Sequence, residues 1–294
     1  MKSSKSLYSR SFKEYELKGY ELKKLQCTLL EMFLDIKNVL DKYDIKYMLS
    51  GGTLLGAIRH NAFIPWDDDI DLMMIRTEYI KFCQIFESEL GDKYELVRPL
   101  QDKYVICKQP KIYKKNTVYI EIPTAGIPEH GKLFIDLFVI ENVPAPGFRR
   151  TIRAKLYDFA YKAASVSADY IFPSHVILEK AKNNLELRKY YNTRRRIGAV
   201  FSHIGGLRFY LTACEKIGVM SKDTGWMGIP SGISYEREIA PSEVYKELTT
   251  CSFCGHQVTI PKNYDIYLKN LYGDYLSIPS EDKREYHAAY KVEI

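Results

Sequence analysis

Three observations predict an α/β (α+β) fold, in which a mixed sheet core is flanked by helices and joined to an added helical region. Short apolar segments alternate with amphipathic segments of helix length through residues 1–145. The Pro- and Gly-rich stretch VPAPGF then marks a break. Residues 146–222 are basic, rich in tyrosine and helical in pattern, whereas residues 223–294 mix helix and strand signals. We expect a core with an N-terminal helix, a helical region, and a C-terminal segment that packs back on the core.

The individual elements follow from local periodicity. Apolar residues recur every three or four positions over residues 16–43, which predicts a long amphipathic helix. Strands are predicted at KYMLS and DIDLMMI, with a helix over TLLGAIRH between them and another over residues 77–90. Further strand candidates are YELVR, YVICK, KIY, TVYIEI and KLFIDLFVIE. The C-terminal segment predicts a helix in PSEVYKEL, a hairpin in CSFCGHQVTIP, and a helix in NYDIYLKNLYGDY that ends at Gly273.

Composition limits the class of protein. A hydrophobic content of 46% and a charged content of 27% over 294 residues are ordinary for a globular chain with a sizeable core. The N-terminus has no apolar signal segment, and no run approaches the 18 apolar residues of a spanning helix. Six scattered cysteines fit a reducing compartment. These features predict a cytoplasmic protein, with peripheral attachment to the inner face of the cytoplasmic membrane as an extension of that expectation.

Positive charge is concentrated in one part of the chain. Between residues 148 and 215 there are 13 Lys and Arg against five Asp and Glu, although the whole chain carries only +6. The arginines of GFRRTIRAK and NTRRRIGAV are interleaved with aromatic residues. This mixture predicts a surface that faces an anionic partner, for which we favour an anionic membrane through 148–215. An ordinary solvated helical face is the alternative, and a nucleic-acid partner is not expected.

The most informative stretch is LSGGTLLGAIRHNAFIPWDDDIDL, which holds four aspartates within five residues. Side chains two positions apart in a strand share one face, about 6.5 Å apart, so Asp69 and Asp71 project together. Two such carboxylates repel each other unless a proton or a hard cation lies between them. Asp136 is a third acid on another apolar strand. The three acids predict a site for Mg²⁺, with Mn²⁺ as the alternative. The competing interpretation is a solvated strand end. For Asp67 and Asp68 we expect loop solvation, or orientation of the neighbouring Asp69 and Asp71.

Glycines and a basic residue precede these acids. Gly51, Gly52 and Thr53 lie between a strand and a helix, where free backbone N–H groups favour an anion. Arg59 could clamp a phosphate through two hydrogen bonds, or it could simply cap the end of its helix. Trp66 could stack on a base or a sugar, or serve in packing. Together with the acids, this order of residues predicts a phosphate-handling site.

The cysteines of CSFCGH raise a separate question. Cys251 and Cys254, with His256 nearby, form one half of a zinc-binding pattern. A second pair of ligands is missing from the neighbouring sequence. A hairpin with chance cysteines is therefore the favoured interpretation over a structural zinc site.

The stretch GGTLLGAIRHNAFIPWDDDIDL resembles the signature of the LicD family of phosphocholine transferases, within the nucleotidyltransferase-fold superfamily. The fukutin-related enzymes are more distantly similar. The resemblance continues through PKIYKKNT, FIDLFVIENVP and IPKNYDIYLKNLYGDY, and covers roughly residues 20–145 and 225–280. Where family members often have Phe-Pro after the third acid, this chain has Phe138-Val139, which affects packing.

The resemblance implies a nucleotidyltransferase-like core and a set of roles. Asp69, Asp71 and Asp136 would be the catalytic acids and metal ligands. The residues expected to bind nucleotide or phosphate are Gly51, Gly52, Thr53, Arg59 and Lys111.

The implied reaction moves phosphocholine, or a related phospho-alcohol, from CDP-choline or a similar CDP-alcohol to a hydroxyl. The acceptor would be a cell-surface glycan or its lipid-linked precursor, as in lipopolysaccharide, teichoic acid or capsule modification, with release of CMP. One alternative is a nucleotidyltransferase that releases pyrophosphate and acts on RNA. The other is a non-catalytic subunit that docks on a membrane. The retained acids favour an enzyme, since a lapsed site has no reason to hold like charges together.

Overall fold

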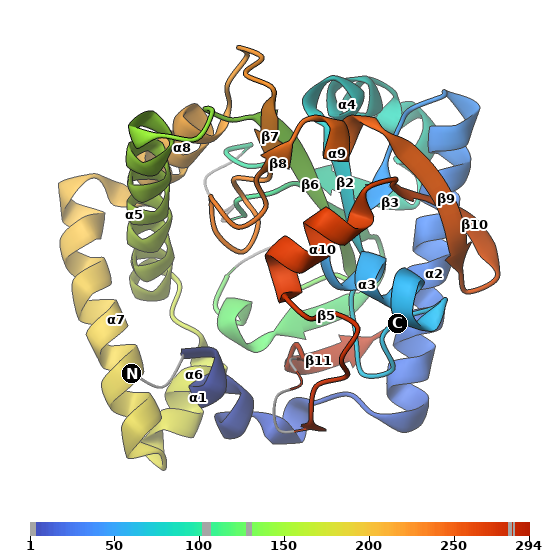
Figure 1. The fold of residues 1–294 in the computed structure, drawn as a ribbon. Coiled ribbons are helices and arrows are strands. Elements are labelled where there is room, and N and C mark those ends of the chain that lie inside the picture. Colours follow the sequence, from blue (N-terminus) through green and yellow to red (C-terminus); the bar gives the residue numbers. More distant parts are fainter. Residues whose placement is uncertain (1–3, 102–106, 128–130, 282–283, 285) are drawn as a thin grey trace.

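A mixed sheet of seven strands lies at the centre of the structure, a computed structural model that describes residues 4–101, 107–127, 131–281, 284 and 286–294 (Figure 1). Five strands run in the order β1-β2-β6-β4-β3, while β7 pairs with β6 and β8 with β7. Strands β2 and β6 are parallel, and the other pairs are antiparallel. The strands are β1 (Met48–Leu49), β2 (Asp71–Ile75), β3 (Tyr94–Val97), β4 (Lys111–Lys114), β6 (Phe134–Asn142), β7 (Trp226–Gly228) and β8 (Ala240–Pro241). The predicted mixed sheet is confirmed.

Strand β6 shows why this sequence forms a sheet with one buried and one functional face. Ile135, Leu137 and Val139 are buried in the core, whereas Asp136 and Phe138 between them are only half-buried. Because successive side chains of a strand point to opposite faces, the alternation places Asp136 on the opposite face of β6 from Ile135, Leu137 and Val139.

Three helices of the N-terminal half flank this sheet: α2 (Gly19–Lys42), α3 (Gly51–His60) and α4 (Arg76–Leu90). Helices α2 and α4 pack against β6, and the buried side of α2 repeats every three or four residues as predicted. Helix α3 begins at Gly51, two residues before the predicted start, so that the paired glycines form its first turn. The described N-terminal residues add α1 (Ser4–Ser11) and the short helix η1 (Lys13–Tyr15).

The predicted helical region forms a layer of helices beside the sheet (Figure 1). Its helices are α5 (Phe148–Ile171), α6 (His175–Lys182), α7 (Leu185–Ile204) and α8 (Gly206–Gly218). Helix α5 packs against both α7 and α8. A Cβ atom on Gly198 of α7 would lie 1.9 Å from the carbonyl oxygen of Val166 on α5, so only glycine permits this close crossing. No helix in the described ranges is both long and apolar enough to cross a membrane.

The C-terminal residues return to the core. They form α9 (Glu243–Lys246), the hairpin β9 (Leu248–Phe253) and β10 (His256–Pro261), α10 (Tyr264–Tyr272) and β11 (Ala289–Glu293). The side chains of Tyr267, Leu268 and Leu271 on α10 belong to the main hydrophobic core. Gly273 ends α10 with a φ of 67°, a conformation that favours glycine.

Two of the predicted strands, TVYIEI and YVICK, are not part of the main sheet that the structure describes. TVYIEI forms β5 (Val118–Glu121), followed by the short helix η2 (Ile122–Thr124), but it pairs with β11 in a separate two-stranded sheet. Most of the predicted strand YVICK lies outside the described residues. The predicted hairpin is confirmed, with Cys251 and Cys254 half-buried and Cys254 in its turn.

Candidate functional site

The register of two parallel strands brings two of the predicted acids together. Asp71 is the register partner of Asp136, and the backbone N–H of Asp136 donates to the carbonyl of Ile70 over 3.2 Å. Register partners project from the same face of a sheet, so the two carboxylates share that face. Asp69 precedes β2. Its negative charge and that of Asp136 both contribute to the raised pKa of Asp71, and Asp136 likewise contributes to the raised pKa of Asp69. The structure therefore groups Asp69, Asp71 and Asp136.

A fourth acid belongs to the same group. Asp67 lines a cleft together with Asp69 and Asp71. It is half-buried in this cleft wall, so loop solvation does not describe it. Asp68, by contrast, is buried and accepts hydrogen bonds from the Tyr119 hydroxyl at 3.2 Å and from His287. Sequence reasoning placed Asp67 and Asp68 in one class, whereas the structure separates them.

The predicted phosphate loop lies directly against this acid cluster. A Cβ atom on Gly51 would be 2.8 Å from Asp71 Oδ2, and one on Gly52 would be 2.8 Å from Asp67 Oδ2. Gly51 also has a φ of 48°, which other residues rarely adopt. The glycines thus allow two carboxylates to approach the N-terminus of α3, where the helix dipole favours negative charge.

Thr53 has a structural contact in this loop. Its hydroxyl oxygen accepts a hydrogen bond of 2.8 Å from the backbone N–H of Asp71. The contact ties the first turn of α3 to the first residue of β2. It fixes the distance between the glycines and the acids, which the sequence order alone does not specify.

Burial and mutual repulsion raise the pKa values of the clustered acids. For Asp69 the pKa rises to about 6, chiefly because burial disfavours the charged carboxylate and further because Asp68 and Asp136 are negative. The pKa values of Asp67 and Asp71 are raised well above their usual range, again first by burial and then by Asp69. The cluster therefore carries its full negative charge only at a cost in free energy.

His287 supplies a positive charge at the edge of this cluster. Its Nδ1 atom lies 3.0 Å from Asp68 Oδ1 and 3.5 Å from Asp69 Oδ2. Burial alone would lower the pKa of His287, but the hydrogen bond and charge of Asp68 raise it well above its ordinary value. No pattern in the sequence pointed to His287, because it lies more than 200 positions from Asp68 and Asp69 and has no recognisable spacing to them.

Lys111 and Asp136 form a buried ion pair. Lys111 Nζ lies 2.8 Å from Asp136 Oδ1, and the same oxygen accepts a hydrogen bond of 3.1 Å from Gln109 Nε2. The ammonium group also lies over the ring of Phe134 at 3.4 Å from its centre. Burial lowers the pKa of Lys111, but the charge and hydrogen bond of Asp136 help to bring it above its ordinary value. The lysine therefore stays charged. The structure thus places Lys111 at the site, with its charge directed at a carboxylate.

A cleft of about 790 Å³ opens beside the acids. A volume of this size suits a nucleotide-sized ligand. Three arginines share its lining with the acids: Arg59, Arg237 and Arg284. Its aromatic lining residues are Trp66, Tyr272 and Tyr275, and the guanidinium of Arg284 lies 4.1 Å from the centre of the Trp66 ring. The cleft therefore combines carboxylates with cations suited to phosphates.

Arg59 has a more specific role than either interpretation of its sequence position. It donates to the carbonyl oxygens of Tyr275 and Ser277 at 2.9 and 3.2 Å. These contacts join the end of α3 to the segment after α10. Arg59 therefore helps to build the wall of the cleft that it also lines.

A buried hydrogen-bond chain supports the glycine loop from the C-terminal segment. The Tyr267 hydroxyl donates to Glu238 Oε2 at 2.9 Å and lies 3.0 Å from Ser50 Oγ. The backbone N–H of Gly51 donates to the same hydroxyl oxygen at 3.3 Å. Burial raises the pKa of Glu238. Sequence analysis missed these residues, since a tyrosine and a glutamate at such distances carry no motif.

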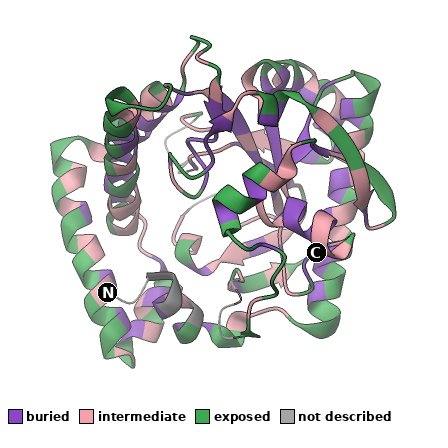
Figure 2. Ribbon diagram, in the orientation of Figure 1, coloured by how far each residue is buried: buried purple, intermediate pink, exposed green. Residues whose placement is uncertain are grey.

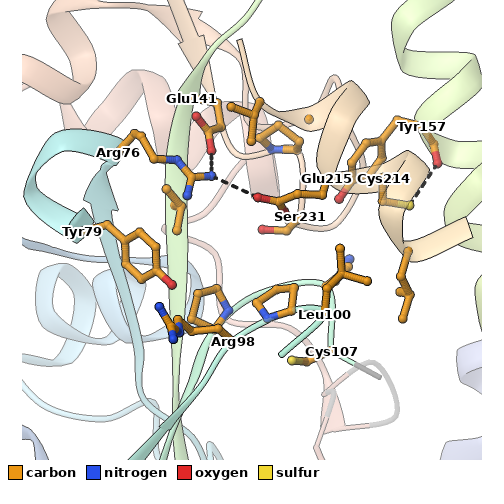
Figure 3. A pocket seen from close by; sticks show the side chains of 18 of the residues that line it. Arg76, Tyr79, Arg98, Leu100, Cys107, Glu141, Tyr157, Cys214, Glu215 and Ser231 are labelled. Atoms are coloured by element: carbon orange, nitrogen blue, oxygen red, sulfur yellow. Dashed lines mark hydrogen bonds and ion pairs between the residues drawn. The ribbon is translucent and has the colours of Figure 1, made fainter. Parts of the chain in front are cut away.

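A second cavity of about 300 Å³ lies between the sheet and the helical layer (Figure 3). Arg76 and Glu141 form an ion pair at one side of it, and Arg76 Nη2 is 3.8 Å from Glu215 Oε1 of α8. These residues lie at the carboxyl ends of β2 and β6, whereas Asp71 and Asp136 lie near the start of both strands. The second cavity is therefore distinct from the acid cluster.

A mixed sheet with a glycine pair at a helix start, acids at the start of β2 and a further acid on the adjacent parallel strand is typical of a nucleotidyltransferase-like protein. Residues 44–182 match the family profile described as LicD/FKTN/FKRP, nucleotidyltransferase domain. Residues 44–182 thus match a nucleotidyltransferase domain of the LicD/FKTN/FKRP type, and the chain is similar to LicD-family transferases.

Individual relatives agree with this assignment. The chain is 29% identical over 281 residues to the lipopolysaccharide cholinephosphotransferase LicD of Haemophilus influenzae, covering 90% of this chain and 97% of that protein. It is 51% identical over 56 residues to the human ribitol 5-phosphate transferase FKRP, covering 19% of this chain and 11% of the human protein. An uncharacterised protein of Rickettsia prowazekii is 34% identical over 106 residues, or 35% and 37% of the two chains.

Proposed function

We propose that this protein transfers phosphocholine, or a related phospho-alcohol, from a CDP-activated donor to a hydroxyl of a cell-surface glycan or its lipid-linked precursor. The observation that carries the proposal is the group of three carboxylates, Asp67, Asp69 and Asp71, on the wall of a cleft that also presents three arginines. Asp136 lies beside Asp71 on the adjacent parallel strand. The similarity to a lipopolysaccharide cholinephosphotransferase over most of both chains supports the choice of donor and acceptor.

The carboxylates fit a hard divalent cation. All of the donor atoms are oxygens, and the raised pKa values show charge that a cation would stabilise. Within the described ranges, no group of three or more His, Cys, Asp or Glu side chains is arranged to hold a metal ion by itself. Mg²⁺ does not need one, because it is held by one or two carboxylates together with substrate phosphates and water. We assign Asp69 and Asp71 as its ligands, with Asp136 as the third acid of the site and Mn²⁺ as the alternative ion.

The bound Mg²⁺ would neutralise the donor diphosphate and the charge that develops on the departing CMP. The chain's own residues would orient the reactants. Arg59, Arg237 and Arg284 present positive charge to the diphosphate from three separate segments. Lys111 and Gln109 hold the Asp136 carboxylate in a fixed direction.

The transfer exchanges one phosphorus–oxygen bond for another. The acceptor hydroxyl oxygen attacks the phosphorus that carries the alcohol, the bond from that phosphorus to CMP breaks, and the hydroxyl proton is released. Trp66, Tyr272 and Tyr275 give the cleft aromatic faces of the kind that attract a quaternary ammonium group. This lining favours choline as the head group.

The test is a donor assay with the full chain and Mg²⁺. CDP-choline, CDP-ethanolamine, CDP-ribitol and CDP-glycerol are supplied separately with a lipopolysaccharide acceptor that lacks phosphocholine. We expect CMP release and labelled acceptor with CDP-choline, and neither product with the Asp71→Asn variant. Pyrophosphate release from a nucleoside triphosphate at a comparable rate, with or without RNA, would contradict the proposal and favour nucleotidyl transfer.

A further inference from the structure

Helix α5 carries an apolar stripe on the side away from the core. Phe148, Ile152, Leu156 and Phe159 are 79%, 41%, 52% and 56% exposed. Their spacing of four, four and three residues puts them on one face of the helix. We call these four residues the α5 stripe. Single exposed apolar residues are common on protein surfaces, but a stripe along three turns of one helix is not.

The end of α7 also has exposed residues (Figure 2), and several of them are apolar. Ile197, Val200 and Ile204 are 44%, 57% and 72% exposed and again share a helix face. Phe201 lies next to that face, and its ring centre is 5.8 Å from that of Phe159 in the α5 stripe. The two apolar faces are therefore joined through this aromatic contact.

Exposed cations border the α5 stripe. At 100° per residue, Lys155 and Lys162 fall along one edge of it and Arg149 along the other. No ion pair is seen for these three within the described part of the chain. The acids of α5 are Asp158, which is half-buried near the lysines, and Asp169, which is paired with Arg194. The surface is thus apolar along its centre and positively charged along its edges.

Arg194 does not contribute to this surface, although it belongs to the arginine run of α7. Its Nη2 atom donates to Ser165 Oγ at 2.7 Å, and its Nε atom donates to Asp169 Oδ2 at 2.5 Å, both on α5. It holds α7 against α5. Arg196 on the same helix is exposed. The cations available to a partner are therefore fewer than the sequence count of the region indicates.

We propose that the α5 stripe and its bordering cations dock this protein on a membrane surface that carries anionic lipid headgroups. Apolar side chains would enter the headgroup boundary, while the lysines and the arginine remain at the level of the phosphates. A second copy of the chain is disfavoured as the occupant, because pairing this face with itself would bring like charges together. The inference is independent of the transfer reaction.

The test is flotation of the 294-residue chain with phosphatidylcholine vesicles, with and without phosphatidylglycerol, in the absence of donor and acceptor. Binding should require phosphatidylglycerol and weaken as salt rises. Leu156→Ser should lower the partition coefficient at least about tenfold. Ile80→Ser on α4, where the wild-type residue is similarly exposed at 48%, should leave it unchanged.

Two double variants test how much the bordering lysines contribute to vesicle binding. Lys155→Gln with Lys162→Gln should lower binding at low salt by about fivefold for each charge, whereas Lys23→Gln with Lys24→Gln on α2 should not. Circular dichroism checks that each variant is folded. Equal binding to vesicles without phosphatidylglycerol, or no binding to either kind, would overturn the proposal. Self-association in sedimentation velocity that Leu156→Ser abolishes would overturn it in favour of contact between copies.

Discussion

The absence of a Cβ atom at Gly51 sets how closely the Asp71 carboxylate approaches the start of α3. Gly51→Ala would place a methyl group 2.8 Å from Asp71 Oδ2 and strain the backbone at a φ of 48°. We expect a loss of about 1–2 kcal/mol in the free energy of unfolding from strain, together with weaker activation of transfer by Mg²⁺. Urea unfolding and a Mg²⁺ titration of activity measure the two effects.

Gly255→Ala is the matched control, because Gly255 has a φ of 84° and open space where its Cβ would lie. It should lose similar stability and keep its response to Mg²⁺. An unchanged Mg²⁺ response in Gly51→Ala would contradict the role of glycine in setting the carboxylate position.

The charge of Asp71 has opposite effects on activity and on stability. Asp71→Asn should reduce transfer at least about a hundredfold, since it removes a proposed cation ligand. In EDTA its melting temperature should hold or rise, because the neutral amide no longer repels Asp69 and Asp136. The exposed Asp92→Asn serves as a control that changes neither quantity. Near wild-type activity of Asp71→Asn at saturating Mg²⁺ would refute the assignment.

At the scale of elements, α10 supports the glycine loop through the hydroxyl of Tyr267. Tyr267→Phe should cost about 1–2 kcal/mol of stability, because Glu238 and Ser50 lose a buried partner. It should also lower kcat/KM, since the Gly51 N–H loses its acceptor. Denaturant unfolding and steady-state kinetics at saturating Mg²⁺ measure the two.

Tyr245→Phe provides the comparison. The Tyr245 hydroxyl is buried and donates to the backbone carbonyl of Glu238, without contact to the glycine loop. Loss of the Tyr245 hydroxyl should reduce stability and leave kcat/KM unchanged. An equal fall in kcat/KM for both variants would show that general loosening, and not loop support, explains the effect of Tyr267.

At the scale of the whole molecule, the Arg76–Glu141 ion pair lies where the sheet meets the helical layer (Figure 3). Burial raises the pKa of Glu141 to about 6, and Glu215 raises it while Arg76 lowers it. Because the folded state binds this proton more tightly than the unfolded state, stability falls as pH rises through about 6. The contribution amounts to at most about 2 kcal/mol.

Glu141→Gln cannot titrate, so its unfolding free energy should change less between pH 5 and pH 7 than that of the wild type. Urea unfolding at pH 5, 6 and 7 measures the difference. Glu236→Gln, at an exposed position, should keep the wild-type slope. Identical slopes for Glu141→Gln and the wild type would contradict the raised pKa of Glu141.

The local elements were predictable from the sequence because their causes are local. The apolar repeat of α2 and the alternation of β6 each follow from side-chain spacing within one segment. The start of α3 was placed two residues late, since glycine is a poor helix former and its use here depends on carboxylates that approach from another strand. The pairing of β5 with β11, rather than with the main sheet, depends on a segment more than 160 positions away.

By itself, the sequence determined which acids are candidates for the site, where most of the helices and strands form, and that residues 146–222 would be helical and basic. Asp69, expected on the same strand as Asp71, instead precedes β2. Only the tertiary structure decided that Asp67 joins the acids while Asp68 binds His287, that Lys111 pairs with Asp136, and that Arg194 is held by α5. The physical reason is that periodicity acts within a few residues, whereas strand register and the packing of distant segments bring together side chains that no spacing in the sequence connects.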